Sequence, residues 1–167
     1  NLVPNDTNGA LDVFVHDVSL SQTTRISVAS NGAEGDLNQN SPGGDPSANG
    51  QLIAFTSEAT TLVPGDTNNS SDVFVRNRQS GTTNRVSVKS NGDQINSARS
   101  GSTAISPDGR FVVFDSASSV LVTEDTNLNR DVFVHDRQTG RTNRVSIKSD
   151  GTQGNDVSQF PYDISEN

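Results

Sequence analysis

Residues 66–75 read DTNNSSDVFV, a polar, oxygen-rich loop that runs directly into a short apolar strand. The pattern occurs three times in the chain, since residues 6–15 read DTNGALDVFV and residues 125–134 read DTNLNRDVFV. The copies are offset by 60 and then by 59 residues. A fixed period of this length is typical of repeat architectures.

A second set of segments keeps the same register. RISV, RVSV and RVSI begin at Arg25, Arg85 and Arg144, and the segment that begins at Gly50 recurs 59 residues later at Gly109. Agreement between independent anchors predicts equivalent folded units. We therefore expect one domain, 1–167, with sequence repeats at about 1–48, 49–107 and 108–167.

The third repeat predicts four strands separated by polar turns. In Asp-Val-Phe-Val the valines point to one face of the sheet and the phenylalanine to the other, so both faces are apolar and should be covered. The fourth strand alternates apolar and polar residues, so we expect it to be a half-exposed edge. The expected strands are Ser102–Ser106, Arg110–Ser116, Asp131–Asp136 and Thr142–Lys148. The phenylalanines in register are the predicted core, and each is worth roughly 1.5–3 kcal/mol when buried: Phe14, Phe55, Phe74, Phe114 and Phe133.

Stacked four-stranded sheets indicate an all-β fold, either a β-propeller or a β-solenoid. The repeat is longer than most solenoid coils, so we expect a β-propeller built of four-stranded antiparallel blades. The chain holds about three blades, a partial ring, whereas closed propellers have roughly 4–8. We expect the ring to be completed by other blades of a longer chain or by a second copy bound head to tail.

Composition excludes several classes of protein. The chain has 29% hydrophobic residues, no cysteine and a net charge of -8. This charge argues against a nucleic-acid partner, which would require clustered Lys and Arg. No apolar run is long enough for membrane insertion. No signal peptide is visible, although the chain does not begin with Met.

Three segments of the third repeat carry a family resemblance. Residues 105–114 read ISPDGRFVVF, 131–134 read DVFV and 144–147 read RVSI. They resemble the blades of TolB-like propellers, the WD40-like PD40 repeats, and the resemblance covers essentially the whole chain. It implies a secreted or periplasmic bacterial protein that acts as a binding scaffold; some relatives are the propellers of peptidases. The first repeat departs from the pattern at 44–50, where an extra proline predicts an irregular inner strand.

The Asp-Thr-Asn loops are the candidate metal sites. Each places oxygen ligands at relative positions 1, 3, 5 and 7, and the residue at position 5 contributes its backbone carbonyl. Calcium prefers such hard oxygen ligands, about 6–8 in number. The candidate ligands are Asp6, Asn8, Ala10 and Asp12; Asp66, Asn68, Ser70 and Asp72; and Asp125, Asn127, Asn129 and Asp131.

The same loops have a purely structural interpretation. Asp-Thr-Asn also forms Asx turns, in which side chains bond nearby backbone N–H groups. His16 and His135 occupy equivalent strand ends, and we interpret them as structural polar residues. Asp17 and Asp136 are expected to face Arg25 and Arg144 across their hairpins as exposed ion pairs.

No catalytic constellation is visible, so we expect a non-enzymatic extracellular binding module for a protein or glycan, with loops stiffened by Ca²⁺. Repeated loops on one rim favour several equivalent binding sites. Two alternatives remain. The chain is the propeller portion of a larger secreted hydrolase or lyase, or it is a structural repeat of a surface layer or filament.

Overall fold

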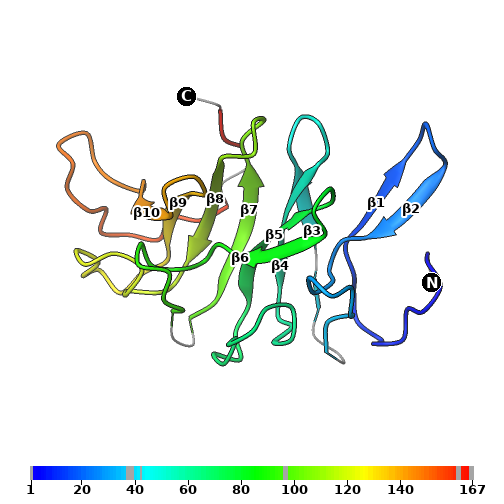
Figure 1. Ribbon diagram of the computed structural model, residues 1–167. Coiled ribbons are helices and arrows are strands. Elements are labelled where there is room, and N and C mark those ends of the chain that lie inside the picture. Colours follow the sequence, from blue (N-terminus) through cyan, green and yellow to red (C-terminus); the bar gives the residue numbers. More distant parts are fainter. Residues whose placement is uncertain (1, 37–39, 42, 96–97, 161–162, 166–167) are drawn as a thin grey trace.

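The computed structural model describes residues 2–36, 40–41, 43–95, 98–160 and 163–165. The described residues form ten strands and no helix. Their sheets stand side by side in chain order, from β1 and β2 at one end to β9 and β10 at the other (Figure 1). The predicted all-β class is confirmed.

The strands form three antiparallel sheets, which we call blades one, two and three. Blade one has two strands, β1 (Phe14–Asp17) and β2 (Gln22–Arg25). Blade two contains β3 (Gly43–Pro46), β4 (Leu52–Ser57), β5 (Asp72–Asn77) and β6 (Thr82–Arg85). Blade three contains β7 (Ser100–Ile105), β8 (Phe111–Ser116), β9 (Asp131–Asp136) and β10 (Arg141–Arg144). The four-stranded blades confirm the predicted architecture, and each takes its first strand from the end of the preceding sequence repeat.

The fourth strand of each blade differs from the prediction. β10 ends at Arg144 rather than Lys148, and β6 ends at Arg85. After β6 the chain turns inward, and Val86, Ser87 and Val88 are at most 9% exposed. β6 and β10 are edge strands in which exposed and buried residues alternate, as predicted. The exposure predicted for Ser87 is wrong, because this serine is held inside by hydrogen bonds and the next blade covers the valines beside it.

The inner strand of the first repeat is also more regular than predicted. β3 pairs with β4 without interruption, from Gly43 opposite Thr56 to Pro46 opposite Ile53. Because β3 is an edge strand, the missing N–H of Pro46 need not cost a ladder hydrogen bond. The irregularity lies instead in β7, where the register shifts between Gly101 and Ala104.

Two apolar clusters fill the junctions between blades. The first joins Val13 and Ile26 of the first repeat to Phe55 and Phe74 of blade two. The second joins the opposite face of blade two to the phenylalanines of blade three. Each blade therefore presents a valine face to the blade that follows and a phenylalanine face to the blade that precedes.

Four of the five predicted core phenylalanines are fully buried. Phe55 stacks on Phe74 with ring centroids 5.6 Å apart, and Phe114 stacks on Phe133 at 6.0 Å. Phe14 is only half-buried, because no β4-like strand pairs with β1 in the described sheet. The core prediction is thus confirmed in the complete blades.

Truncating a buried phenylalanine side chain should strongly destabilise the folded protein. We expect Phe133→Ala to lower the free energy of unfolding by about 3–5 kcal/mol, because the ring is fully enclosed and its loss leaves a cavity. Urea denaturation would measure the change. Phe14→Ala, at the equivalent but half-buried position, should cost clearly less; equal losses would contradict the assignment of the junction core.

Candidate functional site

The Asp-Thr-Asn loops all form Asx turns. In the second loop the Asn68 side-chain oxygen accepts a hydrogen bond from the Ser70 backbone N–H at 3.0 Å. The equivalent bonds measure 2.9 Å in the first loop and 2.8 Å in the third. The next residue is left-handed in every copy, with φ of 68° at Gly9, 51° at Asn69 and 58° at Leu128. The asparagine therefore shapes the loop in each repeat.

A buried arginine lies beside the two aspartates of each loop. Arg85 Nη1 lies 3.2 Å from Asp66 Oδ1 and 3.5 Å from Asp72 Oδ2. The Arg85 side chain is only 10% exposed, and those of the two aspartates 2% and 0%. The same cluster recurs with Arg25 beside Asp6 and Asp12, and with Arg144 beside Asp125 and Asp131.

A serine completes the cluster. Ser87 Oγ donates to Asp72 Oδ1 at 2.5 Å and accepts a hydrogen bond from the Val73 N–H at 3.1 Å. Ser27 and Ser146 make the same pair of bonds in the other repeats. The arginines and serines were absent from the predicted site. Their signal was visible, because both belong to the repeated RISV, RVSV and RVSI segments.

Burial changes the acidity of the second cluster. Loss of water raises the pKa of Asp72 above its usual value of 3.8, despite hydrogen bonds from Ser87 and Asn68. Burial also raises the pKa of Asp66, and the nearby Asp72 charge adds to the effect, while Arg85 opposes it. The folded protein therefore binds protons more readily here than the unfolded chain, so these two groups reduce stability as pH rises.

The arrangement does not fit a calcium ion. The Asn68 oxygen is used within the turn, and its Nδ2 donates to Asp72 Oδ2 at 2.8 Å. The guanidinium of Arg85 already holds the place of a cation between the carboxylates. Within the described part of the chain, no group of three or more His, Cys, Asp and Glu side chains is placed to hold a metal ion. The calcium site stays a prediction, and the geometry favours its alternative, the Asx turn.

The predicted hairpin ion pairs are not formed. Asp17 instead accepts hydrogen bonds from the N–H groups of Ser19 and Leu20 in its own turn. Asp136 binds Arg110 through two contacts of 2.7 and 3.1 Å, and these hold the pKa of Asp136 well below its usual range. The prediction is wrong because Arg25 and Arg144 point into the aspartate clusters.

A threonine on the fourth strand fastens each complete blade to the one before it. Thr142 Oγ1 donates to the Val88 carbonyl at 2.6 Å, and Thr83 donates to the Val28 carbonyl at the same distance. The Thr142 N–H also donates to Ser90 Oγ at 3.0 Å. We call this set of contacts the junction latch.

The histidine of β9 belongs to this latch. His135 Nδ1 lies 2.9 Å from Thr142 Oγ1. The threonine hydroxyl proton is directed to Val88, so the contact assigns the hydrogen to Nδ1 of the ring. Burial lowers the pKa of His135, which favours this neutral form. Arg76 donates to Thr83 Oγ1 at 3.0 Å in blade two, so histidine and arginine perform the same task. Their interpretation as structural strand-end residues fits this geometry.

Two surface hollows of similar volume recur at the junctions. The first cleft, of about 470 Å³, is lined by Ala29–Asn31 and Thr60–Gly65. The second, of about 480 Å³, is lined by Lys89–Asn91, Val120–Thr123 and Arg141–Asn143. Their shared walls stand at equivalent positions of successive repeats. We call them the junction clefts.

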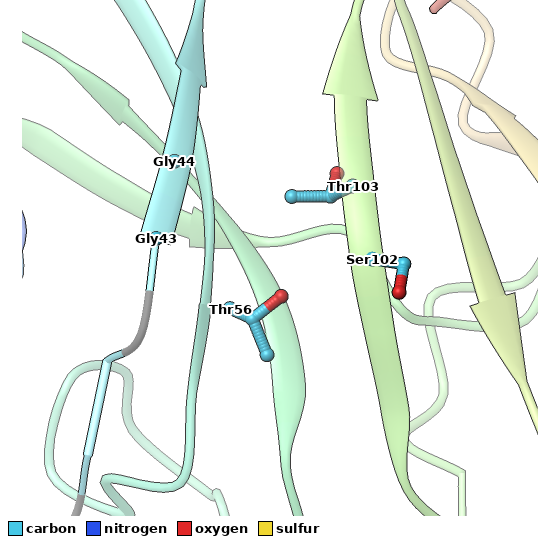
Figure 2. A pocket seen from close by; sticks show the side chains of 5 residues that line it. All are labelled: Gly43, Gly44, Thr56, Ser102 and Thr103. Carbon is cyan, nitrogen blue, oxygen red and sulfur yellow. The ribbon is translucent and has the colours of Figure 1, made fainter. Parts of the chain in front are cut away.

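A further cavity, of about 340 Å³, lies between the inner strands β3 and β7. It is lined by Gly43, Gly44, Thr56, Ser102 and Thr103 (Figure 2). The Thr103 hydroxyl already donates to the Val113 carbonyl at 3.1 Å. This cavity has no titratable side chain in its wall.

Comparison with known proteins supports the fold. No family model and no curated protein matches the chain. The solved structure of a putative TolB from Agrobacterium tumefaciens matches 90% of this chain and 46% of its own, with 20% identity and a TM-score of 0.51. This chain has the fold of a β-propeller segment. The resemblance to TolB-like propellers is thereby confirmed at the level of the fold.

Two further structures show weaker similarity. TolB from Acinetobacter baumannii matches 80% of this chain and 26% of its own, with 17% identity and a TM-score of 0.47. The tricorn protease matches 75% of this chain and 12% of its own, with 14% identity and a TM-score of 0.45. The chain thus spans less than half the length of each of these structures. Within the described residues, no helix is long and apolar enough to cross a membrane.

The arginine cluster predicts a large and pH-dependent effect of mutation. We expect Arg85→Met to cost about 3–5 kcal/mol of unfolding free energy at pH 7, because two buried carboxylates lose their cation. The pKa values of Asp66 and Asp72 should rise further, so the variant should regain stability as pH falls from about 7 to about 5. Urea denaturation across this range would test both effects. Arg99→Met, which removes an exposed ion pair with Glu58, should cost at most about 1 kcal/mol.

The calcium hypothesis can be tested on the same protein. We expect the melting temperature to be the same in Ca²⁺ and in EDTA, because the arginine already occupies the space between the two loop aspartates. Differential scanning calorimetry would measure it. A rise with Ca²⁺ concentration would show that the folded state binds the ion and would restore the calcium interpretation.

Proposed function

We propose that this chain is a non-enzymatic scaffold that binds a protein or glycan through its junction clefts. The repetition of the clefts carries the proposal. Each has an apolar floor, formed by a buried leucine and a half-buried valine, and a wall containing a serine and an asparagine. Such a combination suits a ligand with both apolar and hydrogen-bonding groups.

Equivalent clefts at successive junctions favour an extended or repeating ligand. A ligand that occupies one cleft holds its next unit close to the other, which raises the effective concentration of the second contact. A chain of similar sugar units, or a protein with repeated segments, has this property. We favour binding over catalysis because a catalytic centre is rarely built twice in register from the same residues.

The clefts are rigidly framed, which supports a role in recognition. Ser90 in the wall of the second cleft is fixed by its bonds to Thr142. Asn91 accepts a hydrogen bond from the Asp93 N–H at 3.0 Å, and so closes the turn that forms the rim. A preformed wall loses little conformational entropy on binding. In keeping with the TolB-like resemblance, we place this function outside the cytoplasm, in the periplasm or the secreted fraction of a bacterium.

Blocking one cleft tests the proposal. Thr123 lines the second cleft and is exposed, so Thr123→Trp should fill the cleft without disturbing the core. We expect glycans or proteins that bind the wild-type chain on arrays to bind this variant at least about tenfold more weakly, a loss of about 1.4 kcal/mol. Surface plasmon resonance would give the affinities.

A matched control separates the cleft from general surface effects. Gln79→Trp adds the same ring at an exposed position in the turn between β5 and β6, outside both clefts. This variant should bind like the wild type. Equal binding by Thr123→Trp, or the absence of any ligand on glycan and protein arrays, would contradict the proposal.

A further inference from the structure

We propose that the valine face of blade three binds the phenylalanine face of blade one in a second copy of this chain, head to tail. The proposal is independent of the ligand in the junction clefts. It depends on a comparison between surfaces that another blade covers and equivalent surfaces that no described residue covers.

The valine face of blade three is not covered by any described residue, whereas its counterparts are covered by the next blade. Val145 is 46% exposed and Ile147 is 49% exposed. Val86 and Val88, their equivalents in the second repeat, are 3% and 9% exposed beneath blade three. The first repeat shows the same burial at its own junction, with 1% and 8% exposure at the equivalent Ile26 and Val28.

The strand beside them shows the same difference. Val132 and Val134 of β9 are half-buried, whereas Val73 and Val75 of β5 are at most 1% exposed. A blade therefore completes this apolar face at the first two repeats, and at the third no described residue covers it. Exposed aliphatic groups in one patch favour association with a complementary surface.

Blade one carries that complementary surface. His16 Nδ1 lies 2.9 Å from Thr23 Oγ1, the same distance and pairing as His135 and Thr142. His135 and Thr142 are 7% and 3% exposed because blade two covers them, whereas His16 is exposed and Thr23 half-exposed. Half of the junction latch is thus preformed on blade one.

Blade three carries the other half of the latch. Ile147 occupies the position of Val28 and Val88, whose carbonyls accept the threonine hydroxyls at the two internal junctions. Ser149 occupies the position of Ser30 and Ser90, which bind the N–H groups of Thr83 and Thr142. In the proposed contact Thr23 Oγ1 would donate to the Ile147 carbonyl, and the Thr23 N–H to Ser149.

The two surfaces lie on opposite ends of the array (Figure 1). A contact between unlike surfaces of two copies is heterologous, so each copy keeps one surface available. Blade one offers one phenylalanine, Phe14, where the internal junctions offer two, so we expect weak association. The net charge of -8 opposes it at low ionic strength, and added salt should strengthen it.

Sedimentation velocity of the 167-residue chain, at concentrations up to about 1 mM and in moderate salt, would test the proposal. The wild type should self-associate. Ile147→Asp should abolish association by charging the valine face, and His16→Glu should abolish it by charging the latch surface. Both positions are exposed, so circular dichroism should show unchanged folding; Val145→Lys is the second valine-face variant if Ile147→Asp does not fold.

Mixing the variants gives the decisive result. Ile147→Asp keeps an intact phenylalanine face and His16→Glu keeps an intact valine face, so an equimolar mixture should form a dimer although each variant alone is monomeric. Leu128→Asp adds the same charge at an exposed loop tip and should associate like the wild type. A monomeric wild type, association that survives Ile147→Asp, or a mixture that stays monomeric would overturn the proposal. Ligand binding by monomeric Ile147→Asp would still test the clefts separately.

Discussion

A buried arginine lies between two aspartates in each repeat and fixes the path of the loop that carries them. In the second repeat, Arg85 at the end of β6 lies beside Asp66 at the start of the loop and Asp72 at the start of β5. Removing these charges from water is costly, so the cluster is stable only when all three groups are present and placed together. This requirement ties three distant points of the chain into one geometry, which the other two repeats reproduce.

The apolar contacts act between repeats, whereas the arginine clusters act within them. Because each blade has a valine face and a phenylalanine face, the array has a direction, and every junction joins unlike surfaces. Stability in such an array is approximately a sum of units and nearest-neighbour contacts. A chain with only 29% hydrophobic residues can fold in this way because those residues are concentrated at the junctions.

The strands that were predicted best are those whose side chains alternate between two apolar faces. β9 spans Asp131–Asp136 as predicted, because Val132, Phe133 and Val134 show both faces in the sequence. The segment that follows the fourth strand was wrongly predicted, because the polarity of Ser87 was interpreted as exposure. Its hydroxyl in fact donates a hydrogen bond to Asp72 and accepts one from the Val73 N–H, and these partners lie 15 and 14 residues away. Periodicity shows which positions are polar, but it does not show whether a polar group has a partner inside the fold.

The sequence of the Asp-Thr-Asn loops likewise does not show which partner their oxygens have in the fold, and this explains why calcium was predicted there. A loop with two aspartates and an asparagine offers similar oxygens to a cation and to a guanidinium, so the loop alone does not distinguish them. The arginine follows the first aspartate by 19 residues in every copy (25 − 6, 85 − 66 and 144 − 125). Calcium would have to displace a guanidinium whose side chain is at most 10% exposed and leave that charge buried without its partners. An oxygen-rich loop is therefore a stronger metal candidate when no arginine recurs at a fixed distance from it.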